Sequence, residues 1–412
     1  MVIVRRYCSV LPLVVIFVIT LVTSCQKDDQ GKDYSYFVSK EESATYTKTY
    51  INSLITAASG SIPEISSLKP FIKSDVIIYR VVYKTTVDGK EINASGLVCV
   101  PITPGDYPVL SFQNGTNTVN AYAPSEFALN YSYQMIEIVA SMGYIVVIAD
   151  YPGFGESSQI PHPYLVKEPT VQSLIDMQFA VKEMIPGELE GIVLKDEYYL
   201  IGYSQGGWAT LALHKAMELD YSKDFNLVGS ACGAGPYDIF LLFGSMSDKS
   251  TYPMPVYLGY ILNSYKAYNQ FSNPVTDIFN EPYASRLGSL FNGVLNSDQI
   301  NAQLTTSVPG LITPQFLSGF SALQKYSGVR EALINNSISA WHTYKPLLLV
   351  HGEKDSSVNP ITTEHLYAEM LAAGTSADIC KKVIIPGADH GDGIAPFVIQ
   401  SIQFLMNLGG LK

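Results

Sequence analysis

The sequence predicts an α/β fold in which a doubly wound, mostly parallel sheet carries a largely helical insertion. Strand-like apolar runs alternate with helical stretches as far as residue 236, and the alternation resumes at residue 343. The run 144–150 is apolar almost throughout, which is typical of a parallel strand covered on both faces. Residues 237–342 contain no comparable run and are rich in Tyr, Phe and Pro. We therefore expect a core made of residues 40–236 and 343–412, interrupted by a helical cap or lid at 237–342.

The composition indicates a globular protein with a substantial core. The chain has 412 residues, of which 47% are hydrophobic and 15% charged. Its net charge is −11, and no block of Lys or Arg extends beyond the pairs Arg5-Arg6 and Lys381-Lys382, so no nucleic-acid partner is expected. Cys99, Cys232 and Cys380 lie in strand-like apolar runs and are expected to be buried free thiols. No motif with metal-ligand spacing occurs, so neither a metal nor a cofactor is expected.

The N-terminus has the pattern of an export signal. Arg5 and Arg6 precede an apolar stretch at 11–22 that is too short for a comfortable membrane span. The segment 21–25, Leu-Val-Thr-Ser-Cys, resembles the lipobox of bacterial lipoproteins. This resemblance implies a signal peptide at 1–24, lipidation of Cys25 and a location in the cell envelope of a Gram-negative bacterium, in the periplasm or on the outer surface. A plain secretory signal and an uncleaved anchor helix are the alternatives, and the polar residues that follow predict a tether over 25–39.

The rest of the chain divides into segments with a helix or strand pattern. A hairpin is expected over 76–101, with its turn at Asp88-Gly89. The predicted further strands are 108–113, 144–150, 197–201, 226–234, 346–351 and 382–385. The predicted helices are 40–58, 125–142, 169–185, 207–216, 362–373 and 394–408.

The hexapeptide Gly202–Gly207, Gly-Tyr-Ser-Gln-Gly-Gly, joins a predicted strand to a predicted helix. This G-x-S-x-G pattern is that of a nucleophile elbow, in which a serine sits on a strained turn. Side chains at Gly202 and Gly206 would collide with the neighbouring strand and helix. The N-terminus of the helix would direct free amide groups at Ser204. An ordinary strand–turn–helix connection is the alternative interpretation, so the hypothesis depends on an acid and a histidine farther along the chain.

Both residues occur, in the order serine, acid, histidine. Asp355 follows the predicted strand 346–351, and His390 follows the strand 382–385, so both are expected at the edge of the sheet that carries Ser204. His390 would take the proton of the Ser204 hydroxyl and pass it to the leaving group. Asp355 would orient the imidazole and stabilise its protonated form. Glu353 and Asp389 are the competing acids.

An acyl-transfer site also needs donors for the developing oxyanion. One donor is expected to be the backbone amide of Gln205, directly after the nucleophile. The other is expected from the loop Asn114-Gly115-Thr116, and the sequence does not say which of its amides points inward. The remaining histidines are weaker candidates: His162 and His214 are expected to be structural or exposed, His351 to be a satisfied core residue, and His342 and His365 carry no partner pattern. Asp150 and Tyr151 could line the pocket or stabilise its rim, and the rim is the favoured role.

These motifs resemble the α/β-hydrolase superfamily over about residues 75–410. The segments 112–116, 149–153 and 233–238, with the long insertion that follows them, are similar to the secretory lipase (lipase A-like) branch. Gln113-Asn114 stands where many hydrolases place a histidine before the glycine, which puts the second oxyanion donor in doubt but not the triad.

The residues and the resemblance together favour a serine carboxylic ester hydrolase that acts through an acyl-enzyme on a small-molecule, lipid or polysaccharide ester. In this hypothesis the insertion covers the pocket and aromatic residues line it; the alternative is that these aromatics form the core of the insertion itself. They are Tyr252, Tyr257, Tyr260, Tyr265, Tyr268 and Phe271. A serine peptidase of prolyl-oligopeptidase type and a non-catalytic surface binding module are the alternative functions.

Overall fold

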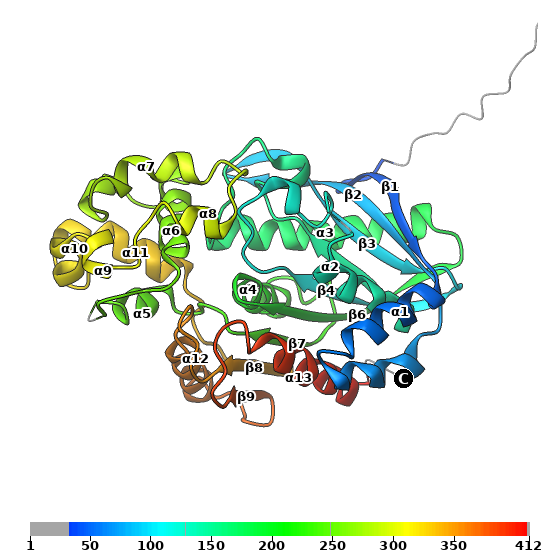
Figure 1. Ribbon diagram of the computed structural model, residues 1–412. Helices are drawn as coiled ribbons and strands as arrows, with labels where there is room; N and C mark the ends of the chain where they lie inside the picture. Colours follow the sequence, from blue (N-terminus) through cyan, green and yellow to red (C-terminus); the bar gives the residue numbers. More distant parts are fainter. Residues whose placement is uncertain (1–32, 128, 248, 410–412) are drawn as a thin grey trace, which may run out of the picture. The chain divides into compact units, whose positions relative to one another are not determined.

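A mixed nine-stranded sheet organises the part of the chain that the computed structural model describes, residues 33–127, 129–247 and 249–409 (Figure 1). The strand order is β1-β2-β3-β5-β4-β6-β7-β8-β9, and the strands from β5 to β9 in this order run parallel. The predicted signal peptide 1–24, Cys25 and the tether up to residue 32 lie outside the described residues. The strands are β1 (Phe37–Tyr46), β2 (Val76–Val87), β3 (Lys90–Pro101), β4 (Gly105–Gln113), β5 (Ile145–Ala149), β6 (Ile192–Tyr203), β7 (Leu227–Gly233), β8 (Leu347–Gly352) and β9 (Cys380–Ile385).

Helices cover both faces of the sheet, so that two apolar layers form the core. One layer packs the sheet against α3 and α4 and continues into the insertion, and the other packs it against α1, the 3-10 helices η1 and η3, and α13. The parallel strands β5 and β8 are buried on both faces, as their apolar runs predict. The helices outside the insertion are α1 (Lys48–Ala58), η1 (Pro63–Phe71), α2 (Tyr131–Glu137), η3 (Ile138–Met142), α3 (Lys167–Glu188), α4 (Gln205–Leu219), α12 (Ile361–Ala372) and α13 (Ile394–Asn407), with short 3-10 turns η2 (Asn120–Tyr122) and η4 (Gly155–Ser157).

The predicted hairpin is confirmed. β2 and β3 pair in antiparallel register from Val76↔Pro101 to Val87↔Lys90. Asp88 and Gly89 form the turn with positive φ angles of 50° and 71°, the left-handed conformation that a two-residue hairpin turn requires.

The predicted helix 40–58 is wrong in its first part, because Phe37–Tyr46 forms the edge strand β1. Only the two end residues of β1 are buried, and its charged middle faces solvent, so the sequence shows no apolar alternation that would identify a strand. Backbone pairing with β2, interrupted by two register shifts, holds β1 in place. The last three residues of the predicted tether, 37–39, therefore belong to the sheet, and the helix begins only at Lys48.

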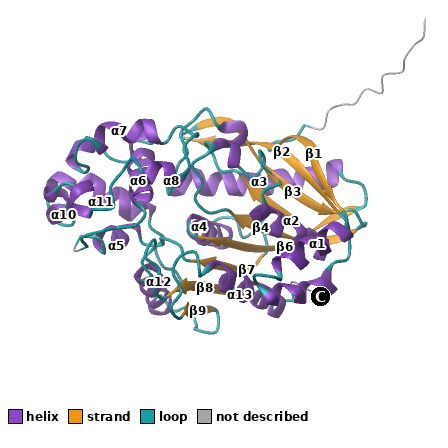
Figure 2. Ribbon diagram, in the orientation of Figure 1, coloured by secondary structure: helices purple, strands orange, loops and turns teal. Residues whose placement is uncertain are grey.

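The segment between β7 and β8 is mostly helical, as predicted (Figure 2). Its strand-like content among the described residues is limited to two isolated bridges, Thr251↔Ser307 and Phe279↔Ile312. Its helices are α5 (Ile239–Gly244), α6 (Pro255–Ala267), α7 (Tyr283–Leu290), α8 (Ser297–Asn301), α9 (Val308–Leu311), α10 (Pro314–Gly319) and α11 (Ser327–Asn336), with 3-10 turns η5 (Val275–Asp277) and η6 (Gln324–Tyr326).

Candidate active site

Ser204 occupies a strained turn between β6 and α4. Its φ and ψ are 60° and −123°, and its backbone amide donates to the Gly233 carbonyl at 2.8 Å. A Cβ on Gly202 would lie 2.4 Å from the Gly206 carbonyl oxygen, and a Cβ on Gly206 would lie 1.9 Å from the Gln113 carbonyl oxygen. Strand, helix and the loop after β4 thus approach one another too closely for any side chain at these two positions.

The structure brings the three predicted residues together. Ser204 Oγ lies 2.9 Å from His390 Nε2, and His390 Nδ1 lies 2.6 Å from Asp355 Oδ2. Because an ionised carboxylate only accepts, Nδ1 carries the proton, and Nε2 is left to accept from the serine hydroxyl. The chemistry available to this arrangement is removal of the Ser204 proton by a base that is already oriented.

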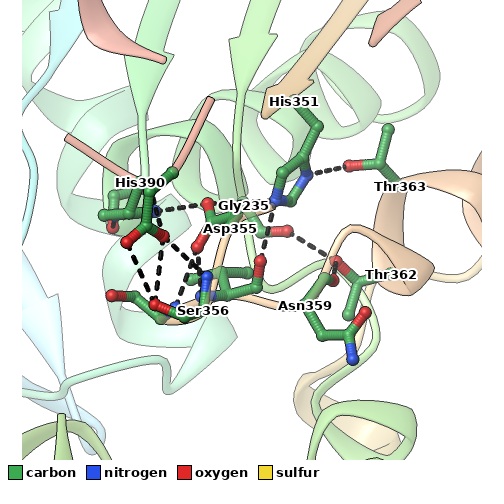
Figure 3. Close-up of polar contacts among 12 residues, drawn as sticks. Gly235, His351, Asp355, Ser356, Asn359, Thr362, Thr363 and His390 are labelled. Atoms are coloured by element: carbon green, nitrogen blue, oxygen red, sulfur yellow. Dashed lines mark hydrogen bonds and ion pairs between the residues drawn. The ribbon is translucent and has the colours of Figure 1, made fainter. Parts of the chain in front are cut away.

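The Asp355 carboxylate is held by four donors. Its Oδ1 accepts from the amides of Ser357 and Val358 at 3.0 and 2.8 Å, and its Oδ2 accepts from His390 and, at 3.2 Å, from His351 Nε2 (Figure 3). Burial by itself would raise the pKa of Asp355. The hydrogen bonds from the two imidazoles outweigh burial, and the pKa falls to about 2. The carboxylate therefore stays ionised at neutral pH.

His351 is buried and satisfied, as predicted, but its contact with Asp355 was not foreseen. Nε2 also lies 2.9 Å from the Val358 carbonyl, which can only accept, so Nε2 carries the proton. Nδ1 then accepts from the Thr363 hydroxyl at 2.6 Å. The one available signal was that His351 precedes Asp355 by four residues, and this spacing has no fixed meaning across a loop.

The two competing acids accept hydrogen bonds from loop amides and do not orient the imidazole of His390. Glu353 accepts from the Gly387 amide at 2.8 Å. Asp389 accepts from the Ser356 amide at 2.7 Å and so ties the loop of Asp355 to the loop of His390. The Tyr203 hydroxyl, which the sequence did not single out, donates to the His390 carbonyl at 2.7 Å and fixes the same loop from the elbow side.

The loop after β4 packs directly on the start of α4. Because Gly206 has no side chain, the Gln113 and Asn114 carbonyls approach its Cα closely, and Asn114, Gly115 and Thr116 line a cavity together with Ser204. Asn114 is 2% exposed, and its carboxamide atoms have no hydrogen-bond partner of good geometry among the described residues. A buried polar group of this kind beside a nucleophile is available to a ligand.

His162 is structural, as expected, and positions Gln205. Its Nδ1 lies 2.8 Å from the Pro152 carbonyl, so Nδ1 donates and Nε2 accepts from the Gln205 side-chain amide at 2.9 Å. Burial lowers the pKa of His162 to about 4. The ring is therefore neutral at neutral pH and holds the residue after Ser204 in place.

The other polar candidates do not reach Ser204. His214 is buried and bonded to Ser230 and Thr343, whereas His365 lies 3.3 Å from Asp238 near the surface. Asp150 is buried and accepts from Ser95 and Ser125, and the Tyr151 hydroxyl donates to the carbonyl of Asn114, which lines the cavity, at 3.1 Å. Neither Asp150 nor Tyr151 is among the described residues that line the cavity, which agrees with the favoured role of stabilising its rim. Cys99, Cys232 and Cys380 are buried and free.

The insertion contacts the loops around Ser204 but contributes little to the cavity wall. The Tyr252 hydroxyl donates to the Ser357 carbonyl at 2.7 Å, and the Tyr260 hydroxyl donates to the Asn117 carbonyl at 3.2 Å. Of the six aromatic residues expected to line the pocket, only Tyr257 does so among the described residues. Tyr252, Tyr260, Tyr265 and Phe271 are buried in the core of the insertion, which was the alternative interpretation.

No group of three or more His, Cys, Asp or Glu side chains among the described residues is placed to hold a metal ion. Of the helices in the described ranges, none is both long and apolar enough to cross a membrane.

The sheet order and the elbow at Ser204 define an α/β-hydrolase fold, as predicted. Within this fold the chain belongs to the secretory lipase family, whose model matches residues 122–387, well over half of the sequence. No curated protein sequence matches the chain.

Solved structures agree with this assignment. A Legionella pneumophila protein assigned as a hydrolase is 25% identical, with a TM-score of 0.79 over 90% of this chain and 98% of its own. The rice cell wall degrading esterase LipA of Xanthomonas oryzae is 23% identical, with a TM-score of 0.75 over 91% of this chain and 97% of its own. Candida antarctica lipase A in its closed state is 15% identical, with a TM-score of 0.66 over 91% of this chain and 83% of its own. The last two similarities concern the fold alone.

Proposed function

We propose that the protein is a serine carboxylic ester hydrolase in which Ser204, His390 and Asp355 form the catalytic triad. The observation that carries the proposal is the continuous hydrogen-bond path from Ser204 Oγ through His390 to Asp355, with distances of 2.9 and 2.6 Å. Membership of the secretory lipase family supports an ester as the substrate.

In the first half of the reaction, Ser204 Oγ attacks the ester carbonyl carbon and its proton moves to His390 Nε2. Asp355, ionised and bonded to Nδ1, stabilises the imidazolium that forms. The tetrahedral intermediate then breaks its carbon–oxygen bond to the alcohol, which leaves with the proton from His390. An acyl group remains esterified to Ser204.

The second half repeats these steps with water. His390 removes a proton from a water molecule, whose oxygen attacks the acyl carbonyl carbon. The intermediate collapses, the bond to Ser204 Oγ breaks, and the serine recovers its proton from His390 while the carboxylic acid departs.

We assign the stabilisation of the oxyanion in both tetrahedral intermediates to backbone amides. Gln205 is the first residue of α4, where the amide has no carbonyl four residues earlier in the helix to bond. The second donor is assigned to the loop Asn114-Gly115-Thr116, with Asn114 or Gly115 favoured, because this loop packs on Gly206 and lines the cavity beside Ser204. Removal of one such donor typically costs about 100-fold to 1,000-fold in kcat.

Hydrolysis of p-nitrophenyl acetate by the Ser204→Ala variant tests the proposal. We expect kcat/KM to fall at least about 1,000-fold, and Ser158→Ala, at an exposed serine, to leave it unchanged. A Ser204→Ala protein as active as the wild type would overturn the proposal. The alternatives differ in outcome: a peptidase would cleave aminoacyl amides faster than the matched esters, and a binding module would cleave neither.

We further propose that Cys25 anchors the mature protein to a membrane of the cell envelope. The support is the lipobox-like segment 21–25, together with membership of a secretory family. Metabolic labelling with a radioactive fatty acid should mark the wild-type protein and the Cys8→Ala control, whereas Cys25→Ala should abolish the label. Equal labelling of Cys25→Ala and wild type would contradict the anchor.

A further inference from the structure

Tyr257 is the one described residue of the insertion that belongs to the wall of the cavity beside Ser204. It lies in the first turn of α6 and is half-buried. The start of this helix is held by a hydrogen bond from the Val256 amide to the Asn301 side chain at 2.9 Å. The cavity has a volume of about 810 Å³, and Ser204 and His390 belong to the same wall. The insertion therefore reaches the site of the reaction through a phenol.

The segment before α6 is tied to the loop of the acid. Tyr252 Oη donates to the Ser357 carbonyl at 2.7 Å, and the Ser357 amide donates to Asp355 Oδ1 at 3.0 Å. Tyr257 follows five residues later and lies within the electrostatic influence of the same carboxylate. Burial raises the pKa of the Tyr257 hydroxyl to about 12, and the negative charges of Asp355 and Asp298 add to this rise. The hydroxyl therefore keeps its proton at neutral pH.

The body of α6 is tied to the loop after β4. Tyr260, one helical turn after Tyr257, donates through Oη to the Asn117 carbonyl at 3.2 Å. The ring of Tyr260 stacks on that of Tyr164 with the centroids 4.3 Å apart, and the Tyr164 and Thr116 hydroxyls lie 2.9 Å from each other. Tyr257 is therefore held between the loop of the acid on one side and the loop assigned to the oxyanion on the other.

The Tyr257 hydroxyl makes no hydrogen bond with any described residue, whereas the hydroxyls of Tyr252 and Tyr260 each donate to a carbonyl. The hydroxyls of Tyr198 and Tyr237 are also unpaired, but they are fully buried, and neither residue lines the cavity. A phenol donates one hydrogen bond, and a largely buried donor is stabilised when a ligand supplies the acceptor. Tyr257 therefore offers a free donor to a molecule that occupies the cavity.

The oxygen of the departing alcohol is an acceptor that the reaction brings to this part of the site. The tetrahedral carbon carries three oxygens, of which one is Ser204 Oγ and another is the oxyanion, assigned to the Gln205 amide and the loop after β4. The third is the alkoxy oxygen, which must approach His390 Nε2 to receive its proton. Cleavage of the carbon–oxygen bond leaves negative charge on this oxygen until the proton arrives, so a second donor there lowers the barrier.

We propose that the Tyr257 hydroxyl donates a hydrogen bond to the alkoxy oxygen of the ester as that oxygen leaves, which makes Tyr257 a fourth catalytic residue, supplied by the insertion. The inference rests on the proposed function, because it needs the acyl-transfer step at Ser204. His390 supplies the proton that the alcohol carries away, and Tyr257 keeps its own. The contribution of Tyr257 grows with the charge on the departing oxygen. It is large for an alkyl alcohol and small for nitrophenol, whose ring delocalises the charge.

Two esters of the same acid test the inference in the full-length protein. Ethyl acetate and p-nitrophenyl acetate differ only in the leaving group, and kcat/KM for each covers the steps up to release of the alcohol. Tyr257→Phe removes the hydroxyl and keeps the ring. We expect its kcat/KM to fall about tenfold to 100-fold for ethyl acetate, the effect of one hydrogen bond to a charged oxygen, and less than about threefold for p-nitrophenyl acetate. Equal losses for the two esters, or no loss for ethyl acetate, would overturn the proposal.

Two further variants separate a chemical role of Tyr257 from a structural one. Tyr283→Phe removes a hydroxyl from a partly buried ring of the same insertion that does not line the cavity, and it should leave kcat/KM unchanged for both esters. Tyr252→Phe removes the bond to the loop of the acid and should lower kcat/KM for both esters by the same factor. If Tyr257→Phe behaves like Tyr252→Phe, its role is structural and the proposal is wrong.

Ser204→Ala distinguishes failure of this inference from failure of the proposed function. If Ser204→Ala is inactive toward both esters, equal losses in Tyr257→Phe refute the role of Tyr257 and leave the proposed function intact. Wild-type activity of Ser204→Ala would refute the proposed function, and the role of Tyr257 with it.

Discussion

The imidazole of His351 donates a hydrogen bond to the Asp355 carboxylate, with Nε2 3.2 Å from Oδ2. The same carboxylate oxygen accepts from His390 Nδ1 at 2.6 Å, so two rings share one acceptor. His351 does not contact Ser204, and we regard it as a positioning residue that fixes the carboxylate toward His390. The two imidazoles also account for the low pKa of Asp355. Burial raises this pKa and both rings lower it, so loss of either ring would let the pKa rise.

Replacement of His351 by Phe should lower kcat about tenfold, the equivalent of one hydrogen bond, and leave KM nearly unchanged. The matched variant His351→Gln retains an N–H donor and should recover most of the lost kcat. Steady-state kinetics with a short ester measure both parameters. If the two variants lose kcat equally, or if only the thermal unfolding midpoint changes, His351 has no positioning role.

Gly206→Ala should disrupt the elbow, because its Cβ would lie 1.9 Å from the Gln113 carbonyl oxygen. To relieve this contact the loop 114–116 must shift away from α4, so we expect kcat/KM to fall by about 100-fold or more, as for the loss of an oxyanion donor. Gly288→Ala in α7 is the matched control, since nothing lies within 4 Å of its added Cβ. Its activity should match wild type, and helix propensity predicts a stabilisation of up to about 1 kcal/mol. Full activity in folded Gly206→Ala would refute the assigned role of this loop.

Burial of Glu137 makes the stability of the protein fall as the pH rises. It is fully buried in α2, it accepts from the Tyr46 hydroxyl at 2.9 Å, and burial raises its pKa to about 8. The folded protein therefore holds a proton that the unfolded chain releases near pH 4.5, and stability falls as pH rises from about 4.5 to 8. Glu137→Gln should raise the unfolding midpoint by several degrees at pH 9 and have little effect at pH 4. Thermal scans at the two pH values measure these midpoints. The control Glu91→Gln, at an exposed position, should show no difference between the two pH values. An equal shift of the Glu137→Gln midpoint at both pH values would exclude the mechanism.

His162 has the opposite effect, because its contribution to stability decreases as the pH falls. Burial lowers its pKa from 6.5 to about 4, so the unfolded chain binds a proton in this window and the folded protein does not. Stability from this residue is therefore present above pH 6.5 and is lost as pH falls toward 4. His162→Gln should be less stable than the wild type at pH 7, because the hydrogen bonds of the His162 ring are lost. The difference in stability between this variant and the wild type should narrow as the pH approaches 4. Exposed His342→Gln serves as the control, and a constant difference across the window would contradict the assignment.

The elements and the three central site residues were predictable because they depend on local patterns. Apolar runs mark the parallel strands, and chain order places Ser204, Asp355 and His390 at one edge of the sheet. β1 was missed because backbone pairing, and not side-chain burial, holds an edge strand. The contact of His351 with Asp355 depends on the path of a loop, which residue spacing does not encode.

No pattern in the sequence indicated the apolar cavity that Ser204 lines. The aromatic residues of the insertion are as apolar as a pocket lining, and composition does not distinguish a lining from a core. The cavity arises from the distance between two helices that the chain separates by more than 250 residues, α2 and α13. Such spacing is a property of tertiary packing, which local sequence patterns do not encode.

The central claim is that Ser204 is a nucleophile activated by His390, and covalent labelling tests it most directly. Treatment of the full-length protein with a fluorophosphonate, followed by peptide mapping, should place a single adduct on Ser204. The adduct should be absent in Ser204→Ala and should form far more slowly in His390→Ala. An unlabelled Ser204 in a preparation that hydrolyses esters would contradict the account.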